Sequence, residues 1–461
     1  MWKYSEIITA LSETDITALL KNSLHGIERE CLRVNEKGDL SQVFHPHSLG
    51  SKLSHPFITT DYAEGQLELV TNPFADVKKT LAQLFDIHHF VYENIDDEFL
   101  WPMSMPCRLC ENNEIPIAQY GSSNIGKYKT LYRQGLGKRY SSKMQAISGV
   151  HYNFSFPDEF WDFLFREFEN NQTKKDFINR AYFAILRNFI RYQWLLIYLF
   201  GASPVIHKSF FKNKPDELIN LDGKCFYGEY ATSLRMSEIG YSNHERCRYD
   251  ISRNNLSSFI TDLKKATNTA YKDFMNLGIF EEGQRSQING NILQIENEYY
   301  ASIRPRQVLQ SPDEKLTQAL AQRGVGYLEI RSIDVDPLNS IGIDEEQLRF
   351  THLFILYCLC KESPIFDQKN QDEIIKNKNK VALWGRKEGC LLIKNRGKIT
   401  LNEWGEIILD EMKPLVKALD QGDKDKTYAQ ILQRQVQKLE EAALTPSSII
   451  LEKMEDSGKN Y

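Results

Sequence analysis

The sequence predicts an α+β fold, an antiparallel sheet with one polar face and helices packed outside it. Strand-like segments cluster before residue 340, and helical periodicity dominates from about 344 onward. Several strands carry charged residues on one face only, which indicates a shared polar cavity. No repeat, low-complexity tract or linker divides the chain. We therefore expect one domain, 1–461, with a sheet-containing core at 20–343 and a mainly helical C-terminal region at 344–461.

Composition excludes several classes of function. The 461 residues suffice to bury a substantial core, and they are 41% hydrophobic and 26% charged with a net charge of −5. A general nucleic-acid binder needs a basic face for phosphates, so we expect no nucleic-acid partner. Residues 1–21 lack the apolar run of a signal peptide, and polar side chains interrupt the most apolar segment, 183–202. We expect no membrane association and a cytoplasmic location, where most of the eight cysteines would be reduced thiols.

The first strand carries two acids on one face. An amphipathic helix is predicted around 4–20, and the strand follows at 26–34. Side chains in a strand alternate between two faces, so Glu28 and Glu30 leave the same face one pleat apart. Two carboxylates this close repel each other unless a cation lies between them. The alternative is a surface strand whose acids face water.

A second acidic strand is predicted in the later half of 58–71, after a polar loop at 44–56. Glu68 lies between two leucines there and therefore points to the opposite, polar side. Apolar residues spaced three and four apart predict a helix over 76–95, with His88 packed on its apolar stripe.

Two local motifs are interpreted as chance matches. Cys107 and Cys110 have the spacing of a redox or zinc pair, but neither a second Cys or His pair nor a βαβ context accompanies them. In the basic, glycine-rich tract 118–143, residues 121–127 begin a phosphate-binding loop pattern, but Tyr128 replaces the required Ser or Thr. A flexible basic loop near a nucleotide remains an alternative for that tract.

The clearest half-buried strand is 150–156, in which polar and large apolar residues alternate without a fault. His151, Asn153 and Ser155 share its polar face. His151 is either a surface residue or a ligand beside the acidic strands. Helices are predicted to fill 158–202.

Further strand-like segments are predicted at 230–237 and within 288–300. The strand at 327–333 places Glu329 and Arg331 on one face and apolar residues on the other. Its charged face is the second sign of a polar cavity.

The polar faces together offer hard oxygen ligands with fixed cations beside them. The candidate ligands are Glu28, Glu30, Asp61, Glu68, His151 and Glu329, and the cations are Arg235 and Arg331. This donor set suits Mg²⁺ or Mn²⁺ far better than zinc or copper. Magnesium commonly shares its coordination with phosphates, so the cluster points to ATP or another phosphoryl donor. A metal-dependent phosphatase or nucleotide hydrolase would use the same carboxylates.

Eight motifs in order resemble glutamate–cysteine ligase of the bacterial type. The resemblance runs from about 20 to 350 and continues more weakly to 447. The motifs are Gly-Ile-Glu-Arg-Glu at 26–30, Ile-Thr-Thr-Asp-Tyr-Ala-Glu at 58–64, Trp-Pro-Met-Ser-Met-Pro-Cys at 101–107, Gln-Tyr-Gly-Ser-Ser-Asn at 119–124, Ile-Ser-Gly-Val-His-Tyr-Asn-Phe-Ser at 147–155, Tyr-Ala-Thr-Ser-Leu-Arg at 230–235, Leu-Gln-Ile-Glu-Asn-Glu at 293–298 and Tyr-Leu-Glu-Ile-Arg-Ser-Ile-Asp at 327–334.

The resemblance implies a sheet curled into a funnel, related to the glutamine synthetase core, and ATP-dependent joining of the glutamate γ-carboxylate to the cysteine amino group. It implies that Glu30 and Glu68 hold one magnesium, that Glu28, His151 and Glu329 hold a second, and that Asp61 assists at a further site. Arg331, with Glu329 and Arg235, would be catalytic, and Arg331 and Arg133 would contact the nucleotide. The residues lining the amino-acid pockets would be Tyr62, Tyr132, Leu136, Gln145, Arg235, Tyr241 and Tyr300.

The expected partners are therefore L-glutamate, L-cysteine and ATP, with Mg²⁺ or Mn²⁺, acting on a monomer. The expected chemistry transfers the γ-phosphoryl group of ATP to the carboxylate, and the amine then attacks the acyl phosphate. Tyr62 stands where relatives often carry Phe, and 65–66 is Gly-Gln where more apolar residues are usual. Either departure could alter the cysteine pocket, and a related ligase that uses another amine remains an alternative.

Overall fold

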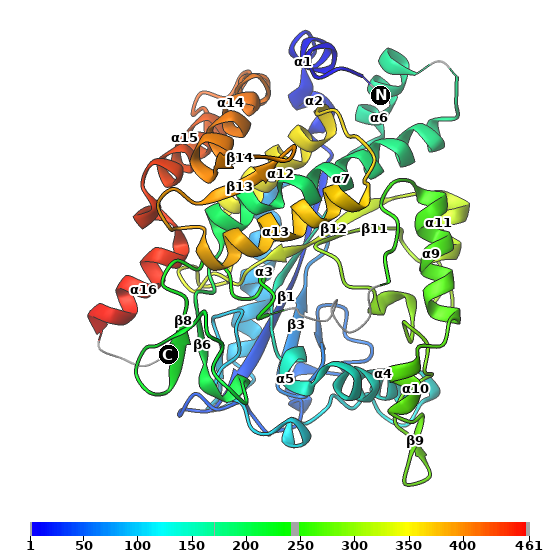
Figure 1. Cartoon of the computed structure of the whole chain (residues 1–461). Coiled ribbons are helices and arrows are strands. Elements are labelled where there is room, and N and C mark those ends of the chain that lie inside the picture. Colours follow the sequence, from blue (N-terminus) through cyan, green and yellow to red (C-terminus); the bar gives the residue numbers. More distant parts are fainter. Residues whose placement is uncertain (1, 170, 241–248, 458–461) are drawn as a thin grey trace.

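The computed structural model describes residues 2–169, 171–240 and 249–457 (Figure 1). Its main sheet has seven strands in the order β11-β12-β5-β1-β3-β2, with β4 paired to β1, and every pairing is antiparallel. The strands are β1 (Leu24–Val34), β2 (Ile58–Thr60), β3 (Gln66–Val70), β4 (Phe99–Leu100), β5 (Val150–Ser155), β11 (Ile303–Arg306) and β12 (Tyr327–Ile333).

Helices surround this sheet. They are α1 (Tyr4–Ser12), α2 (Ile16–Leu20), α3 (Val77–Tyr92), α4 (Asn124–Tyr140), α5 (Ser142–Gln145), α6 (Asp158–Phe168), α7 (Lys174–Phe200), α9 (Leu256–Asn268), α10 (Lys272–Asn276), α11 (Leu316–Arg323), α12 (Glu345–Cys360), α13 (Gln368–Trp384), α14 (Leu401–Leu419), α15 (Thr427–Glu440) and α16 (Pro446–Ser457). Short 3-10 helices are η1 (His47–Leu49), η2 (Asn112–Glu114), η3 (Lys208–Phe210), η4 (Glu296–Glu298) and η5 (Ala442–Leu444). The predicted α+β class is confirmed.

Smaller sheets flank the main one. They contain β6 (Val205–His207), β7 (Ile219–Asn220), β8 (Cys225–Tyr227), β9 (Phe280–Glu281), β10 (Gln284–Arg285), β13 (Leu391–Lys394) and β14 (Gly397–Thr400). Among the described residues after 344, the β13–β14 hairpin interrupts a region that is otherwise mainly helical. Its two-residue turn, Asn395 and Arg396, has positive φ at both positions, the geometry that matches the twist of a tight hairpin.

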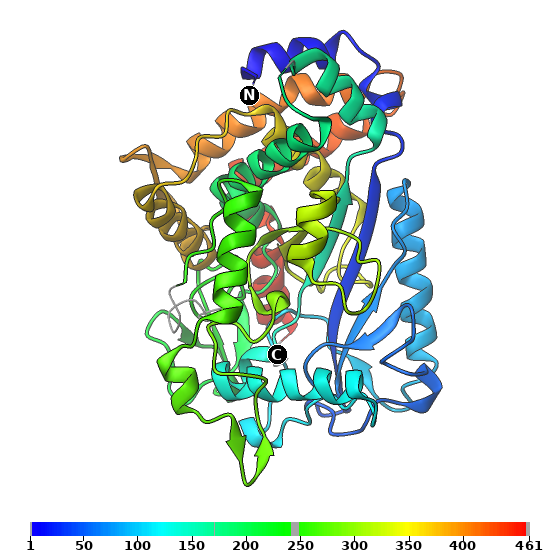
Figure 2. The same ribbon diagram turned by 90° about the vertical axis from the view of Figure 1, so that its right-hand side faces the viewer.

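The apolar face of the main sheet forms the core. Tyr152 and Phe154 of β5 and Leu328 and Ile330 of β12 are fully buried. They belong to one hydrophobic cluster that extends from Trp2 near the N-terminus to Leu439 on α15. Figure 1 shows α7, α12 and α13 side by side across this region, and Figure 2 shows α3 running along β1. The core therefore fixes the strands that carry the polar face.

Two predicted strands are absent from the described structure. Residues 230–237 form turns, and their backbone pairs with residues of other segments, as when the Thr232 N–H donates to the Ala382 carbonyl. Residues 288–300 form bends and η4. In both segments, apolar and polar residues alternate although no strand forms. Packing against distant parts of the chain can bury every second side chain without the hydrogen bonds of a sheet.

Several local predictions need adjustment or are confirmed. The predicted helix at 4–20 is two helices, α1 and α2. The basic tract at 118–143 contains the helix α4, capped by Ser123, where a flexible loop was the alternative. Two helices fill 158–202 as predicted, and His88 is buried in α3. Within the described ranges, no helix is long and apolar enough to cross a bilayer.

Candidate active site

A cavity of about 410 Å³ opens on the polar face of the main sheet. The sheet, α4, the 144–147 segment and the 292–300 segment all contribute to its walls. It gathers twelve of the predicted site residues, namely Glu28, Glu30, Asp61, Tyr62, Glu68, Tyr132, Arg133, Leu136, Gln145, Tyr300, Glu329 and Arg331. Segments far apart in the chain therefore meet where the sequence predicts a shared polar cavity.

Strand register explains why the acids meet. In β1, Glu28 pairs with His151 of β5, and Glu30 pairs with Glu68 of β3. Residues directly opposite in antiparallel strands project from the same face, so these four side chains share one side of the sheet. Two glutamates directly opposite each other repel, which disfavours the sheet unless a cation compensates them.

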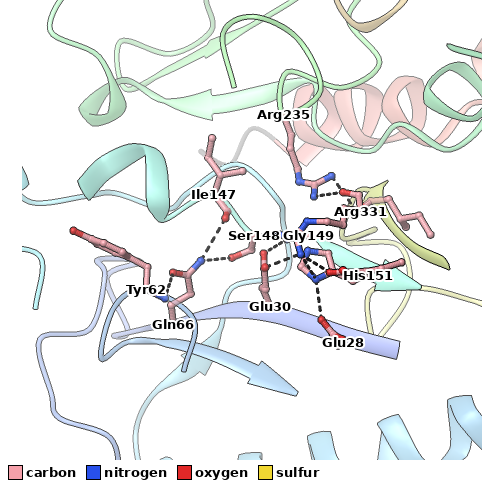
Figure 3. Close-up of polar contacts among 12 residues, drawn as sticks. Glu28, Glu30, Tyr62, Gln66, Ile147, Ser148, Gly149, His151, Arg235 and Arg331 are labelled. Carbon is pink, nitrogen blue, oxygen red and sulfur yellow. Dashed lines mark hydrogen bonds and ion pairs between the residues drawn. The ribbon is translucent and has the colours of Figure 1, made fainter. Parts of the chain in front are cut away.

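Ligand atoms of Glu28, Glu68 and His151 all lie within 4.8 Å of one another. His151 Nδ1 is 3.1 Å from Glu28 Oε2, and His151 Nε2 is 3.3 Å from Glu30 Oε1 (Figure 3). The Gly149 N–H also donates to Glu30 Oε2 at 2.8 Å. The cluster thus contains two carboxylates and one imidazole at metal-ligand spacing, with a third carboxylate adjacent.

The electrostatics of this cluster favour a bound cation. Burial, followed by the charges of Glu28, Asp61 and Glu30, raises the pKa of the Glu68 carboxyl well above its usual value. Burial and the charge of Glu30 raise the pKa of Asp61 to about 6. The shifts thus come first from burial and then from neighbouring negative charge, which a divalent cation would neutralise. Carboxylate oxygens with one imidazole are donors that Mg²⁺ and Mn²⁺ accept, so the residues fit such an ion.

Glu329 has a different environment from the other acids. Arg304 of β11 makes a two-point contact with it, at 3.1 Å from Nε to Oε2 and 2.8 Å from Nη2 to Oε1. Arg306 and Arg331 approach it at 3.3 and 2.7 Å. Burial alone would raise the pKa of Glu329, but the three guanidinium groups outweigh it and hold this pKa well below its usual value. Glu329 therefore contacts three arginines in this structure, and its predicted role as a metal ligand beside Glu28 and His151 stays a prediction.

Helix α4 lines the cavity with residues one turn apart. Lys129, Tyr132, Arg133 and Leu136 follow the three-and-four spacing that places side chains on one helical face. Arg133 donates to the backbone carbonyls of Asp61, Thr60 and Lys129, and its guanidinium carbon lies 4.6 Å from the Tyr120 ring centre. These neutral carbonyls and the Tyr120 ring thus fix the Arg133 guanidinium at the cavity without neutralising its charge.

Two residues of the segments that depart from the usual pattern, Tyr62 and Gln66, contact each other, and Tyr62 lines the cavity. The Tyr62 hydroxyl lies 2.8 Å from the Ser142 hydroxyl. Gln66 Oε1 accepts the Tyr62 backbone N–H (Figure 3). The Gln66 amide donates to the Ile147 carbonyl and the Ser148 hydroxyl, both at 3.4 Å. These polar contacts connect β3 to the 147–149 segment.

Arg235 lies next to the cavity and not on its surface. Its side chain is fully buried, and it donates to the carbonyls of Arg331 at 2.7 Å and Ile333 at 3.2 Å. These contacts coincide with the register shift in β12 between Ile330 and Ile333. Its predicted contact with an amino acid stays a prediction. Tyr241 lies outside the described residues.

Comparison with known proteins places the chain in a family. The sequence model of glutamate–cysteine ligase matches residues 8–381. The chain is 43% identical over 443 residues to a glutamate–cysteine ligase of Pseudomonas putida, an alignment that covers 96% of this chain and 84% of that protein. The chain belongs to the glutamate–cysteine ligase family. Members of this family join glutamate to cysteine in an ATP-dependent reaction, so the protein is a ligase.

Solved structures support the same assignment. A glutamate–cysteine ligase from Francisella tularensis, crystallised in complex with AMP, matches with a TM-score of 0.88 and 38% identity, over 94% of this chain and 85% of that one. A bifunctional glutathione synthetase from Pasteurella multocida matches with a TM-score of 0.76 and 25% identity, over 98% of this chain and 52% of that one.

Some cavity residues escaped sequence reasoning. Arg304 and Arg306 alternate around Pro305 in β11, which is a short strand signal that could have been combined with Glu329. Lys129 precedes Arg133 by one helical turn, which could have been read once α4 was recognised as a helix. Glu298, by contrast, lies in the quoted motif at 293–298, but no periodic pattern assigned it to the cavity, because its segment is irregular.

Proposed function

We propose that this protein joins the γ-carboxylate of L-glutamate to the amino group of L-cysteine in this cavity, through a γ-glutamyl phosphate, with ADP and phosphate as the other products. The observation that carries the proposal is that the cluster of Glu28, Glu68 and His151 lies beside guanidinium groups at one cavity. A phosphoryl donor that brings both a cation and negative oxygens complements both halves of that arrangement.

Mg²⁺ or Mn²⁺ would be held by Glu28, Glu68 and His151, with Glu30 and Asp61 within reach. When bound, the ion would compensate charge on the phosphoryl oxygens of ATP. Asn153 donates to Glu28 Oε1 at 2.8 Å, which orients that carboxylate while its other oxygen faces His151. Ligands oriented in this way need little reorganisation when the substrates arrive.

Arg331 would contact the transferring phosphoryl group, and Arg133 would contact the nucleotide. Glu329 holds Arg331 Nη1 at 2.7 Å, and the Arg331 guanidinium carbon lies 5.7 Å from the Tyr300 ring centre. These contacts orient the Arg331 guanidinium toward the cavity and leave some of its N–H donors available for a ligand. The glutamate carboxylate is a poor acyl donor until it is phosphorylated, so the protein must align two substrates and compensate charge, and no protein nucleophile is required.

The amine would enter between Tyr62, Tyr132, Leu136, Gln145 and Tyr300. This part of the cavity distinguishes the proposed reaction from that of a related ligase that uses another amine. We also infer a cytoplasmic monomer that acts on three small molecules. The seven described cysteines are free thiols, the state expected in a reducing compartment.

Phosphate release from Mg·ATP by the purified protein tests the proposal. The assays contain glutamate alone, cysteine alone or both, and mass spectrometry follows the organic product. Release that requires both amino acids, with γ-glutamylcysteine formed, is the expected result. If phosphate release requires glutamate and another amine but does not depend on cysteine, the amine substrate is that other compound and not cysteine. Phosphate release without any amino acid would show that the protein hydrolyses ATP and would contradict the ligase reaction.

A further inference from the structure

Two walls of the cavity are joined by a buried polar contact that the proposed chemistry does not use. Helix α4 contributes Tyr132 and Leu136 to one wall, and the 292–300 segment contributes Leu293 and Tyr300 to another. The segment is irregular except for η4, so hydrogen bonds of a sheet ladder do not hold it in place. Its position relative to α4 must come from side chains.

Arg139 of α4 and Glu298 of η4 form an ion pair between these walls. Arg139 Nη1 is 3.0 Å from Glu298 Oε1, and the two side chains are 0% and 1% exposed. Arg139 Nε also donates to Gln287 Oε1 at 3.0 Å, and its guanidinium carbon lies 4.4 Å from the Phe274 ring centre on α10. Figure 1 shows α4 and α10 close together at this corner of the molecule. A buried pair of this kind is favourable only while both charges remain hydrogen-bonded.

Glu298 needs both of its oxygens for these contacts. Oε1 accepts the Tyr140 hydroxyl at 3.0 Å in addition to Arg139, and Oε2 accepts the backbone N–H of Gln294 at 2.6 Å. An amide at this position would either lose an acceptor for Arg139 or direct an NH₂ group at the Gln294 N–H. The network therefore requires a carboxylate.

A second contact between the same walls lies one helical turn away. A Cβ added to Gly135 would lie 2.1 Å from Gln294 Oε1, so the absence of a side chain at 135 permits this approach. Gln294 Nε2 donates to the Tyr132 carbonyl at 3.3 Å, and its Oε1 accepts the Ile288 N–H at 3.0 Å. We call Gly135, Arg139, Gln294 and Glu298 the wall clamp.

We propose that the wall clamp sets the width of the part of the cavity that receives the amine substrate, so that Arg139 and Glu298 are positioning residues for amine selectivity. This inference rests on the proposed function, because it assigns Tyr132, Leu136 and Tyr300 to amine binding. The clamp residues belong to the C-terminal part of α4 and the 294–298 segment, whereas the acid cluster belongs to β1, β3 and β5. Arg133 of α4, assigned to the nucleotide, is held separately by the carbonyls of Thr60 and Asp61. Loosening the clamp should therefore change amine binding more than the binding of ATP or metal.

Three variants test the wall clamp in the full-length protein. Glu298→Gln removes the charge at nearly constant size, and Gly135→Ala pushes α4 away from Gln294 without touching the ion pair. Lys138→Gln is the matched control, because Lys138 adjoins Arg139 in α4 but its exposed ion pair with Glu281, at 3.0 Å, joins β9 outside the cavity lining. For each variant, kcat and KM are measured for ATP, glutamate and the amine, together with the melting temperature.

Both clamp variants should raise the KM for cysteine by about tenfold, since a displaced wall forfeits shape complementarity with a small substrate. Their preference for cysteine over a bulkier amino acid, measured as the ratio of kcat/KM values, should fall by a similar factor. The KM for ATP should change by less than about twofold, and Lys138→Gln should match the wild type in every parameter.

The inference is overturned if either clamp variant folds and retains wild-type selectivity, or if the KM values for ATP, glutamate and amine all rise together with a fall in melting temperature. If Glu298→Gln does not fold, Gly135→Ala decides. A wild-type protein that ignores cysteine would contradict the proposed function and not the clamp, which is then tested with the amine that the wild type accepts.

Discussion

Glu28 and His151 face each other across β1 and β5, with Glu28 Oε2 3.1 Å from His151 Nδ1. Burial alone would raise the pKa of Glu28, but the hydrogen bond from His151 and further contacts outweigh it and hold this pKa below its usual value. Glu28 is thus kept ionised beside Glu68, whose pKa is shifted upward. The register of β1 therefore places Glu28, which is kept ionised, next to Glu68, whose ionised form a cation would stabilise.

Glu28→Gln should abolish ligation while leaving the fold intact. The amide keeps the size of the side chain but removes a charged oxygen from the cation site, and we expect kcat to fall by at least about 100-fold. The assay is ATP- and glutamate-dependent formation of γ-glutamylcysteine at saturating Mg²⁺. Glu36→Gln, at an exposed position just beyond β1, is the control. Wild-type activity in Glu28→Gln would remove this residue from the site.

Glu68→Gln should stabilise the metal-free protein while inactivating it. Folding raises the pKa of this carboxyl, so the stability of the wild type should rise as the pH falls through that raised pKa toward the ordinary pKa of a glutamate. Removing the charge should increase the free energy of unfolding by about 1 kcal/mol. Melting curves with and without Mg²⁺ check this. Mg²⁺ should raise the melting temperature of the wild type much more than that of the variant, and equal shifts would contradict a metal ligand at Glu68.

Lys129→Gln should weaken ATP binding specifically. Lys129 lines the cavity one turn before Arg133, and its Nζ has no hydrogen bond or ion pair with any other described residue. Burial, followed by the neighbouring charge of Arg133, lowers the pKa of the Lys129 ammonium, and a phosphate would relieve both effects. We expect the KM for ATP to rise about tenfold, the loss of one charge-assisted contact. Lys127→Gln, exposed on the same helix, should leave the KM unchanged, and equal effects of the two variants would argue against a phosphate contact.

His88→Leu should stabilise the protein, more so in acid. Burial, with a smaller contribution from Arg29, lowers the pKa of His88 from 6.5 to about 2, and both ring nitrogens are buried without a partner. Leucine avoids this desolvation and should add about 1 kcal/mol to the free energy of unfolding at pH 7.5. Below pH 6.5 the unfolded histidine binds a proton that the folded one refuses, so the advantage should grow by about 2 kcal/mol at pH 5. Urea unfolding at both pH values measures the difference, and a pH-independent advantage would contradict a neutral His88.

Local patterns in the sequence accounted for much of the fold and for the members of the site. Alternation identified β1, β5 and β12 and assigned their polar side chains to one face, because a period of two depends only on the strand itself. Helical spacing identified α3 and placed His88 in the core for the same reason. The resemblance of eight ordered motifs, confirmed by the family match, supplied the reaction.

The tertiary structure decided which of these residues meet. Whether Glu329 joins the metal ligands or the arginines depends on β11, which brings Arg304 and Arg306 beside it. The positions of Arg235 behind the cavity and of Glu298 between its walls depend on irregular segments that carry no periodic signal. Register, loop paths and buried ion pairs result from contacts between distant parts of the chain, and their free energies arise only when those parts pack together. The sequence by itself therefore determined the chemistry available on each strand, and tertiary packing determined its geometry.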